Sequence, residues 1–309
     1  QEGSIVINSK LFGDIIRKLP DSFVEIETDE DNNVYINCLN SKFKIKGDSA
    51  KEYPQIPDVN EDKLYSIPQD VLKSMIKQTV FATSQDQTKP ILMGELLEIE
   101  NGNINLVAID GYRFAVRSCQ VDNLIHEDLK AKIIIPGKTL IDVNSLLSSE
   151  EEVKVGFNEK NAIFIINDTK IVTRLLEGEF IDYKKLCPRE YNSKIKLKTK
   201  DLLNSIERAS LLSQSEQNNL IKLSIRDSMM AITSNNEKGN VYEEVALSLE
   251  GDYLDIAFNS RYLLEGLKNI DCEEIYIEFT TNVNPCIIKP ADGTKYTYLL
   301  LPVRISSNN

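Results

Sequence analysis

The feature that most constrains this chain is an internal repeat. Stretches with apolar residues at helical spacing begin near residues 8, 68, 136, 199 and 259, about every 60 to 68 residues. Each stretch is followed by short runs of alternating apolar residues and by turn residues, which predict antiparallel strands. One such unit has too little core to fold alone, so we expect units to pair, each pair burying two helices against two sheets. The sequence therefore predicts an α+β fold built from five repeated helix-plus-antiparallel-sheet units.

Several residues mark turns and helix starts within these units. Asn101 and Gly102 separate two strand-like runs and predict a tight hairpin, because this pair readily adopts positive φ. Pro68 and Pro136 precede two of the helical stretches, and we expect them in the first helical turn, where a missing N–H costs nothing. Asn259 is expected to cap the last helix.

Composition excludes several classes of function. The chain has 309 residues, of which 41% are hydrophobic and 27% charged, as in ordinary soluble globular proteins of two or more domains. No apolar run approaches the ~20 residues of a membrane span and no signal peptide opens the chain, so we expect a cytoplasmic protein without membrane contact. Five cysteines are scattered without a CxxC pair, and His126 is the only histidine. We therefore expect no disulfide framework, no metal, no cofactor and no histidine-based catalytic triad.

The charge is unevenly distributed. The net charge of −12 would exclude nucleic acid if it were evenly spread, but the five helical stretches carry ten bases against six acids. Any single lysine can be explained as part of an ordinary solvent-exposed helix face. The excess of bases on the five helical stretches, with the acids concentrated elsewhere, instead favours a basic surface inside an acidic shell. Such a surface would hold double-stranded DNA by its phosphates without reading bases. The expected DNA-facing residues are Lys10, Arg17, Lys73, Lys77, Gln85, Lys138, Arg208 and Lys268.

A motif follows the Asn101-Gly102 hairpin. On pattern alone, Asp110 is a turn residue, Gly111 permits a sharp turn and Arg113 is an exposed base. The whole phrase VAIDGYRFA, residues 107–115, resembles the VATDGxRLA signature of the bacterial DNA polymerase III beta subunit family, the sliding clamps. Ile109 stands where the family has threonine, and Phe114 where it has leucine.

The resemblance implies a DNA-clamp fold with strands outside and helices lining a central tunnel. A clamp protomer has three domains of two units each, so five units here lead us to expect a chain lacking the N-terminal half of domain one. The implied boundaries are 1–61 for the second half of domain one, 62–190 for domain two and 191–309 for domain three. Linker-like composition near residues 54–62 and 187–192 agrees with these boundaries.

The C-terminal segment carries a second resemblance. Taken alone, three leucines before Pro302 indicate an edge strand of the last sheet. The segment also resembles the YVVMPMRL ending of the clamps, which implies one wall of a groove for short apolar motifs of polymerases and other partners. The implied groove residues are Lys89, Leu92, Gly111, Tyr112, Arg113, Phe114, Ile181, Lys185, Leu186, Asn259, Tyr262, Leu299, Leu300, Leu301, Pro302, Val303 and Arg304.

The resemblance also implies assembly and partners. Phe43 and Ile45 match the apolar pair that domain one contributes to a head-to-tail homodimer ring, and Leu211 and Leu212 match its counterpart on domain three. Ordinary core packing is an equally good explanation for all four residues. The implied function is a non-catalytic processivity factor. It would encircle DNA without sequence specificity and bind the replicative polymerase, the clamp loader and other clamp-binding proteins.

A different class of function is a carboxylate-dependent hydrolase. Asp110 could act with a second acid such as Asp86 or Glu95, because paired carboxylates can perform acid–base chemistry in a cleft. Acids are abundant in this chain, however, and it has neither a glycine-rich phosphate loop nor a nucleophile motif. The clamp is therefore favoured.

Overall fold

The computed structural model describes residues 3–54, 64–121, 130–148, 151–213 and 219–304. The chain divides into two compact units, Gln1–Asp58 and Val59–Asn309, and each is described by itself. Helices occur where the apolar repeat predicts them. Within the described residues they are α1 (Ser9–Lys18), α2 (Gln69–Thr79), α3 (Gly137–Leu146), α4 (Thr199–Ser213) and α5 (Ser260–Leu267).

The smaller unit packs α1 against a three-stranded antiparallel sheet. Asn8 caps α1, and its Oδ1 accepts a hydrogen bond of 2.9 Å from the backbone N–H of Leu11. Ile15, Val34 and Ile36 form the small buried core. The strands of this unit are β1 (Ile5–Val6), β2 (Glu25–Thr28), β3 (Asn33–Cys38), β4 (Ser41–Lys46) and β5 (Asp48–Ser49), with β1 paired to β5.

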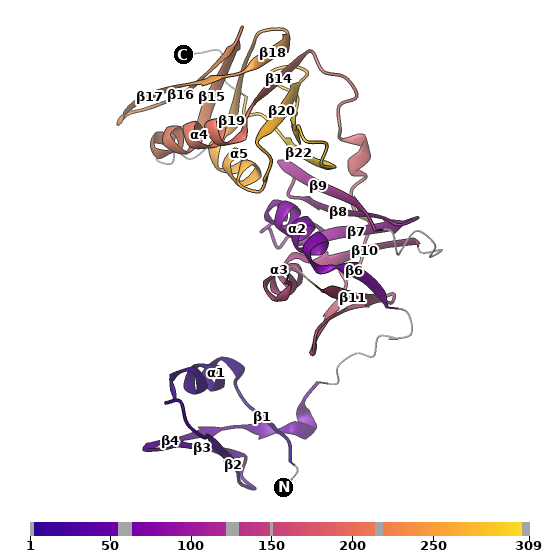
Figure 1. Ribbon diagram of the computed structural model, residues 1–309, viewed down its shortest axis with the longest axis vertical. Coiled ribbons are helices and arrows are strands. Elements are labelled where there is room, and N and C mark those ends of the chain that lie inside the picture. The colour runs from indigo at the N-terminus through magenta and orange to yellow at the C-terminus, as the bar shows by residue number, and fades with distance from the viewer. Residues whose placement is uncertain (1–2, 55–63, 122–129, 149–150, 214–218, 305–309) are drawn as a thin grey trace. The chain divides into compact units, whose positions relative to one another are not determined.

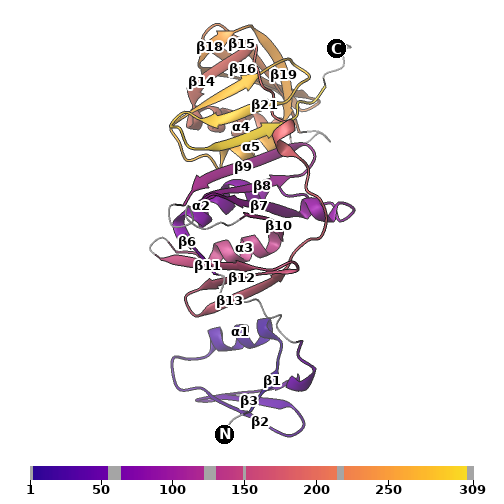
Figure 2. The same cartoon turned by 90° about the vertical axis from the view of Figure 1, so that its right-hand side faces the viewer.

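The larger unit is organised around one nine-stranded antiparallel sheet. Its order is β10 (Lys130–Pro136), β7 (Gly94–Glu100), β8 (Asn103–Ile109), β9 (Arg113–Gln120), β22 (Tyr296–Leu300), β21 (Cys286–Pro290), β20 (Glu274–Phe279), β14 (Ser193–Lys198) and β18 (Ser248–Gly251). Figure 1 shows α2, α3, α4 and α5 on the same side of this sheet, and in Figure 2 the strands lie in front of them.

Two four-stranded sheets complete the larger unit. Each pairs its strands in antiparallel fashion, as the hairpin pattern predicts. One has the order β13 (Thr169–Arg174), β12 (Asn161–Ile166), β11 (Glu152–Phe157), β6 (Tyr65–Pro68), and the other β17 (Gly239–Ala246), β16 (Met229–Asn236), β15 (Leu220–Arg226), β19 (Leu254–Asn259). Helix α2 packs on α3, and α4 packs on α5.

Strand β22 lies inside the nine-stranded sheet. It pairs with β21 on one side and with β9 on the other, where Leu299 lies opposite Phe114. The expectation of an edge strand is therefore wrong, because the partner strand comes from a distant part of the chain. Pro302 follows the end of β22 and removes no N–H from the ladder.

The turn residues behave largely as predicted. Asn101 has φ of 50° and Gly102 of 74°, which confirms the hairpin between β7 and β8. Pro68 and Pro136, however, each end a strand and occupy the N-cap position instead of the first helical turn. Proline's fixed φ suits extended backbone as well as a helix, so the sequence could not separate the two positions.

Period-two alternation gives the nine-stranded sheet two apolar faces. Residues such as Leu97 and Leu106 face α2 and α3, whereas Leu96 and Val107 face the opposite side. No helix in the described parts of the chain is long and apolar enough to cross a membrane.

Candidate functional site

The turn between β8 and β9 places the motif residues. The Oδ1 atom of Asp110 accepts hydrogen bonds from the backbone N–H groups of Tyr112 (2.8 Å) and Arg113 (3.0 Å), which confirms its role in the turn. Gly111 has φ of 99°, a conformation that residues with side chains rarely adopt. The turn directs Tyr112 to the surface and Arg113 into the protein.

Arg113 is buried, with only 5% of its surface exposed. Its Nε donates to Oδ2 of Asp110 at 2.9 Å, and its Nη2 donates to the carbonyl oxygen of Phe81 at 2.8 Å. Its Nη1 lies 2.6 Å from Oε2 of Glu265, in the geometry of an ion pair. The guanidinium also stacks 4.5 Å from the ring centre of Tyr262. The expectation of an exposed base is wrong, because acids and rings from other segments surround this charge.

The charges in this cluster reinforce one another. Burial alone would lower the pKa of Arg113, but Tyr298, Asp110 and Glu265 together raise it above its ordinary value. Burial raises the pKa of Glu265, whereas hydrogen bonds from Arg261 and Arg113 lower it by more, so its net shift is downward. Both members of the Arg113–Glu265 pair therefore stay charged at neutral pH and join β9 to α5.

An apolar cluster lies on the face of β7, β8, β9, β10 and β22 that is turned away from the helices. We call it the outer-face cluster. Its buried members are Leu92, Leu96, Val107, Ile109, Phe114, Ile134, Phe180, Tyr183, Ile287 and Leu299. Leu92, Phe114 and Leu299 were expected as groove residues, and all three are buried here, Leu299 with 4% exposed. They can form the floor of a groove but not its exposed anchors.

Other expected groove residues are exposed beside this floor. Tyr112, Ile181, Leu186 and Leu301 are large apolar side chains at the surface, Leu301 with 39% exposed. The backbone N–H of Leu301 donates to the carbonyl oxygen of Tyr112 at 2.9 Å, which ties the end of β22 to the turn before β9. We call these four residues the groove rim.

Polar and aromatic groups flank the rim. The rings of Tyr112 and Tyr262 stack with their centres 6.0 Å apart. Asn259 caps α5, and its Oδ1 accepts from the backbone N–H groups of Arg261 (3.0 Å) and Tyr262 (3.3 Å), as predicted. Lys185 forms an ion pair of 2.9 Å with Asp182.

The remaining expected groove residues differ in accessibility. Lys89 and Arg304 are exposed, Pro302 is half-buried, and the N–H of half-buried Val303 donates to the carbonyl oxygen of Ala257 at 2.8 Å. Leu300 is fully buried on the other face of β22, in the core beneath α5. It therefore cannot contact a peptide on the rim side, since neighbouring strand residues point to opposite faces.

The expected DNA-facing residues are all exposed: Lys10, Arg17, Lys73, Lys77, Gln85, Lys138, Arg208 and Lys268. Several already have acidic partners. Lys77 lies 3.0 Å from Asp271, and Lys268 lies 2.8 Å from Glu207. Exposed ion pairs contribute only about 0–1 kcal/mol each, so a nearby phosphate can replace the acid.

The four expected dimer residues fall into two groups. Phe43 on β4 and Leu211 on α4 are exposed. Ile45 packs against the core of the smaller unit, so the core-packing alternative describes it. Leu212 is half-buried.

The acids of the hydrolase alternative are engaged elsewhere. Asp110 holds the turn and Arg113. Glu95 is fully buried, and Oγ1 of Thr79 lies 2.5 Å from its Oε2; burial raises the pKa of Glu95 to about 8. Asp86 accepts from the backbone and side chain of Thr88 in an exposed loop. Among the described residues, no group of three His, Cys, Asp or Glu side chains could hold a metal ion.

Sequence reasoning missed Phe81, Glu265, Phe180 and Tyr183, which complete the site. Their contacts join segments far apart in the chain, such as the 2.8 Å hydrogen bond from the Tyr183 hydroxyl to Glu98. No local pattern marks such residues. One sequence signal was available for Phe180 and Tyr183, because they are the two aromatic residues of the segment FIDYKKLCP, residues 180–188.

Comparison with known families matches three consecutive domain models. Residues 1–57 match the N-terminal domain of the DNA polymerase III beta subunit, residues 66–182 its central domain and residues 184–304 its C-terminal domain. The Beta sliding clamp of Staphylococcus epidermidis is 36% identical over 307 residues, which cover 98% of this chain and 81% of that protein.

Solved structures agree in fold. The DNA polymerase sliding clamp of Bacillus subtilis is 35% identical and superposes with a TM-score of 0.93 over 99% of this chain and 81% of that one. The DNA polymerase III beta subunit of Thermotoga maritima is 27% identical, with a TM-score of 0.90 over 99% of this chain and 83% of that one.

These matches correct one expectation. The chain was expected to lack the N-terminal half of domain one, but residues 1–57 match the N-terminal domain model itself. Counting helical stretches in a single sequence does not reveal how many such units make up one domain. The α+β clamp fold with its three domains is confirmed. The chain therefore belongs to the DNA polymerase III beta subunit family, the beta sliding clamps.

Proposed function

We propose that this chain encircles double-stranded DNA and tethers the replicative polymerase to it. Membership of the family makes the chain a non-catalytic processivity subunit in DNA replication. Four finer features stay predictions: the five-unit count, the central tunnel, the implied domain boundaries and the cytoplasmic location. The fold of the larger unit supports the tunnel, because α2, α3, α4 and α5 lie on one side of the nine-stranded sheet (Figure 1).

Tethering would use the groove whose floor is formed by Leu92, Phe114 and Leu299 of the outer-face cluster. The observation that carries this proposal is the pairing of β9 with β22, which brings Tyr112 and Leu301 together beside buried Phe114 and Leu299. Exposed apolar side chains over an apolar floor favour a partner segment with one or two apolar anchors. Exposed charges such as Lys89 and Lys185 would fix its orientation. The polymerase, the clamp loader and other clamp-binding proteins are the proposed partners.

DNA would be held through the exposed bases of the helices. These side chains reach phosphates rather than base edges, so affinity would not depend on sequence. The surface acids that now pair with Lys77 and Lys268 would be displaced, since such pairs are weak in water.

Ring closure would use a head-to-tail homodimer. Exposed Phe43 on β4 would contact Leu211 and Leu212 on α4 of a second copy, and Ile45, which packs against the core of the smaller unit, would support it from the same strand. A closed ring with two identical interfaces satisfies the symmetry that soluble oligomers favour.

The groove can be tested by isothermal titration with a synthetic peptide from a polymerase C-terminus. Leu301→Ala should weaken binding by about 1–2 kcal/mol, because a rim anchor contact is lost while the floor stays intact. Leu146→Ala on α3 is the matched control, since Leu146 is similarly exposed but lies away from the outer-face cluster. Equal affinity in both variants would contradict the groove.

A further inference from the structure

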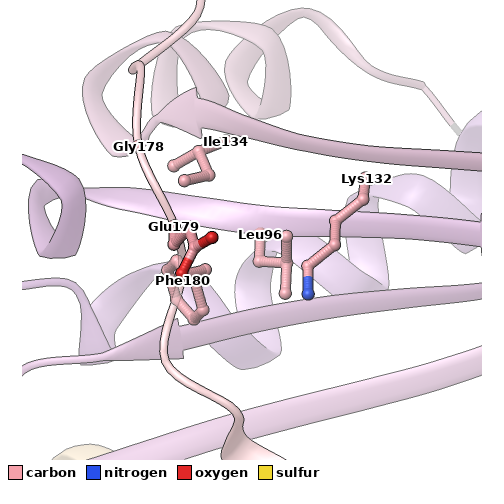
Figure 3. A pocket seen from close by; sticks show the side chains of 6 residues that line it. All are labelled: Leu96, Lys132, Ile134, Gly178, Glu179 and Phe180. Atoms are coloured by element: carbon pink, nitrogen blue, oxygen red, sulfur yellow. The ribbon is translucent and has the colours of Figure 1, made fainter.

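A separate cavity lies beside the groove floor, between the nine-stranded sheet and the segment that follows β13. Its volume is about 390 Å³, and its lining residues are Leu96, Lys132, Ile134, Gly178, Glu179 and Phe180. We call it the connector pocket (Figure 3). Its size falls within the ~300–1,000 Å³ typical of ligand sites. None of its lining residues belongs to the groove residues expected from the sequence.

The floor of the connector pocket is apolar and continuous with that of the groove. Leu96 on β7 lies directly opposite Ile134 on β10, so both side chains face the same side of the sheet. Leu96, Ile134 and Phe180 belong to the outer-face cluster, together with Phe114 and Leu299 beneath the groove rim. A side chain bound in the pocket would therefore rest on the same cluster as one bound in the groove.

Two opposite charges stand at the edges of this floor. In Figure 3 the carboxylate of Glu179 points over Leu96 from the connecting segment, and Lys132 approaches Leu96 from the other side. Within the described chain, Glu179 makes no hydrogen bond or ion pair. Lys132 is 59% exposed, and its Nζ lies 3.7 Å from Glu98. Glu98 also accepts from Tyr183 and pairs with Lys184 at 3.6 Å, so it keeps partners when Lys132 turns away.

The connecting segment is fixed in place, so Glu179 is presented on a rigid backbone. The N–H of Leu176 donates to the carbonyl oxygen of Ile134 at 2.9 Å. Gly178 has φ of 140°, and a Cβ there would lie 2.4 Å from Cδ1 of Ile91, so only glycine allows this close approach. Phe180 is buried directly after Glu179. A pocket held in this way loses little entropy when it binds a ligand.

We propose that the connector pocket binds one apolar side chain of a partner peptide, with a basic residue on one side of that anchor and an acidic residue on the other. The basic residue would meet Glu179, and the acidic residue would meet Lys132. The peptide would be a continuation of the segment held in the groove, since both sites share one floor. This inference rests on the proposed function of the groove.

Methyl NMR of the full chain distinguishes the two sites. Leucine and isoleucine methyl groups are labelled, so that Leu96 and Ile134 report on the connector pocket and Leu301 reports on the groove. The short probe is a synthetic peptide with two adjacent apolar anchors. Extended probes add Lys-Leu-Glu or Glu-Leu-Lys through a Gly-Ser-Gly spacer at either end.

At least one extended probe should shift Leu96 and Ile134 as well as Leu301, whereas the short probe should shift only Leu301. Glu179→Gln and Lys132→Gln should each weaken that extended probe by about threefold, the size expected for an exposed charge contact. Exchanging the charges with Lys132→Glu and Glu179→Lys together should reverse the preference between Lys-Leu-Glu and Glu-Leu-Lys. Lys154→Gln and Glu159→Gln are matched controls on the β11–β12 hairpin and should change nothing.

Shifts at Leu301 without shifts at Leu96 and Ile134, for every extended probe, would overturn the connector pocket and leave the groove standing. An unchanged order preference after the charge exchange would overturn the charge assignment and the proposal with it. The absence of shifts at all three positions would overturn the groove and the connector pocket together.

Discussion

Arg113 and Glu95 are both buried ionisable residues, but the protein treats them in opposite ways. Arg113 keeps its charge because Asp110, Glu265 and the carbonyl oxygen of Phe81 surround the guanidinium. Within the described residues, the one hydrogen bond to the Glu95 carboxyl comes from the hydroxyl of Thr79, so burial favours its protonated form. The charged state of Arg113 and the protonated state of Glu95 can each be tested by measuring the free energy of unfolding.

Replacing Arg113 should leave Asp110 without its cation and Glu265 with Arg261 as its remaining partner. We expect Arg113→Gln to lower the free energy of unfolding by about 3–5 kcal/mol, as is usual when one partner of a buried pair is removed. Urea unfolding of the whole chain measures this. Arg174→Gln is the control, because Arg174 forms an exposed pair with Glu177 and its loss should cost less than about 1 kcal/mol. Similar losses in both variants would contradict the buried network.

Glu95 should make the protein less stable as pH rises. The pKa of this carboxyl is about 8 in the folded state against 4.5 for the ordinary group, so folding takes up a proton between these values. Stability is fully present below about pH 4.5 and falls by at most about 1.4 kcal/mol per pH unit until pH 8. Glu95→Gln should remove this fall, since an amide stays neutral and can still bond to Thr79.

The measurement is urea unfolding of both proteins from pH 5 to pH 9. The stability advantage of Glu95→Gln should grow up to about pH 8 and then level off. Glu159→Gln, at an exposed position, is the control and should show no such trend. A constant difference across the range would show that Glu95 is ionised in the folded protein.

At the scale of elements, local signals predicted the helices and the β7–β8 hairpin, because the spacing of apolar residues and the turn-forming residues can be recognised within a few positions of the sequence. The pairing of β22 with β9 and the burial of Arg113 were not predictable without the resemblance, since both depend on segments far apart in the sequence. The same limit applies to the groove. The residue types were predicted, but two details of the groove were not. Leu300 is excluded because it occupies the other face of β22, and Leu301 is exposed because it lies beyond the end of that strand.

This division predicts different effects for two neighbouring leucines. Leu299→Ala should lower the free energy of unfolding by about 2–5 kcal/mol, because it leaves a cavity in the outer-face cluster. Leu301→Ala should cost far less stability, since that side chain is partly exposed. Thermal or urea unfolding of the two variants side by side tests this. Equal losses would place both residues in the core and remove Leu301 from the rim.

At the scale of the whole molecule, the chain is acidic overall, whereas the proposed DNA-facing residues include exposed bases on the helices. Reversal of Lys73, Lys77, Arg208 and Lys268 to Glu should weaken retention on DNA equally for any sequence and reduce the salt dependence. Binding assays on two unrelated duplexes over a range of salt measure both effects. The matched control reverses Lys154, Lys160, Lys170 and Arg174 on the β11–β13 sheet. A loss confined to one duplex would contradict binding through phosphates alone.

Above all, we propose that the chain holds DNA by encircling it. The most direct measurement loads the protein onto a nicked circular plasmid with a bacterial clamp loader and ATP, and then separates bound from free protein by gel filtration. We expect the protein to stay with the circular plasmid and to be released when a restriction enzyme makes it linear, because a ring slides off a free end. Equal retention on circular and linear DNA would contradict encirclement.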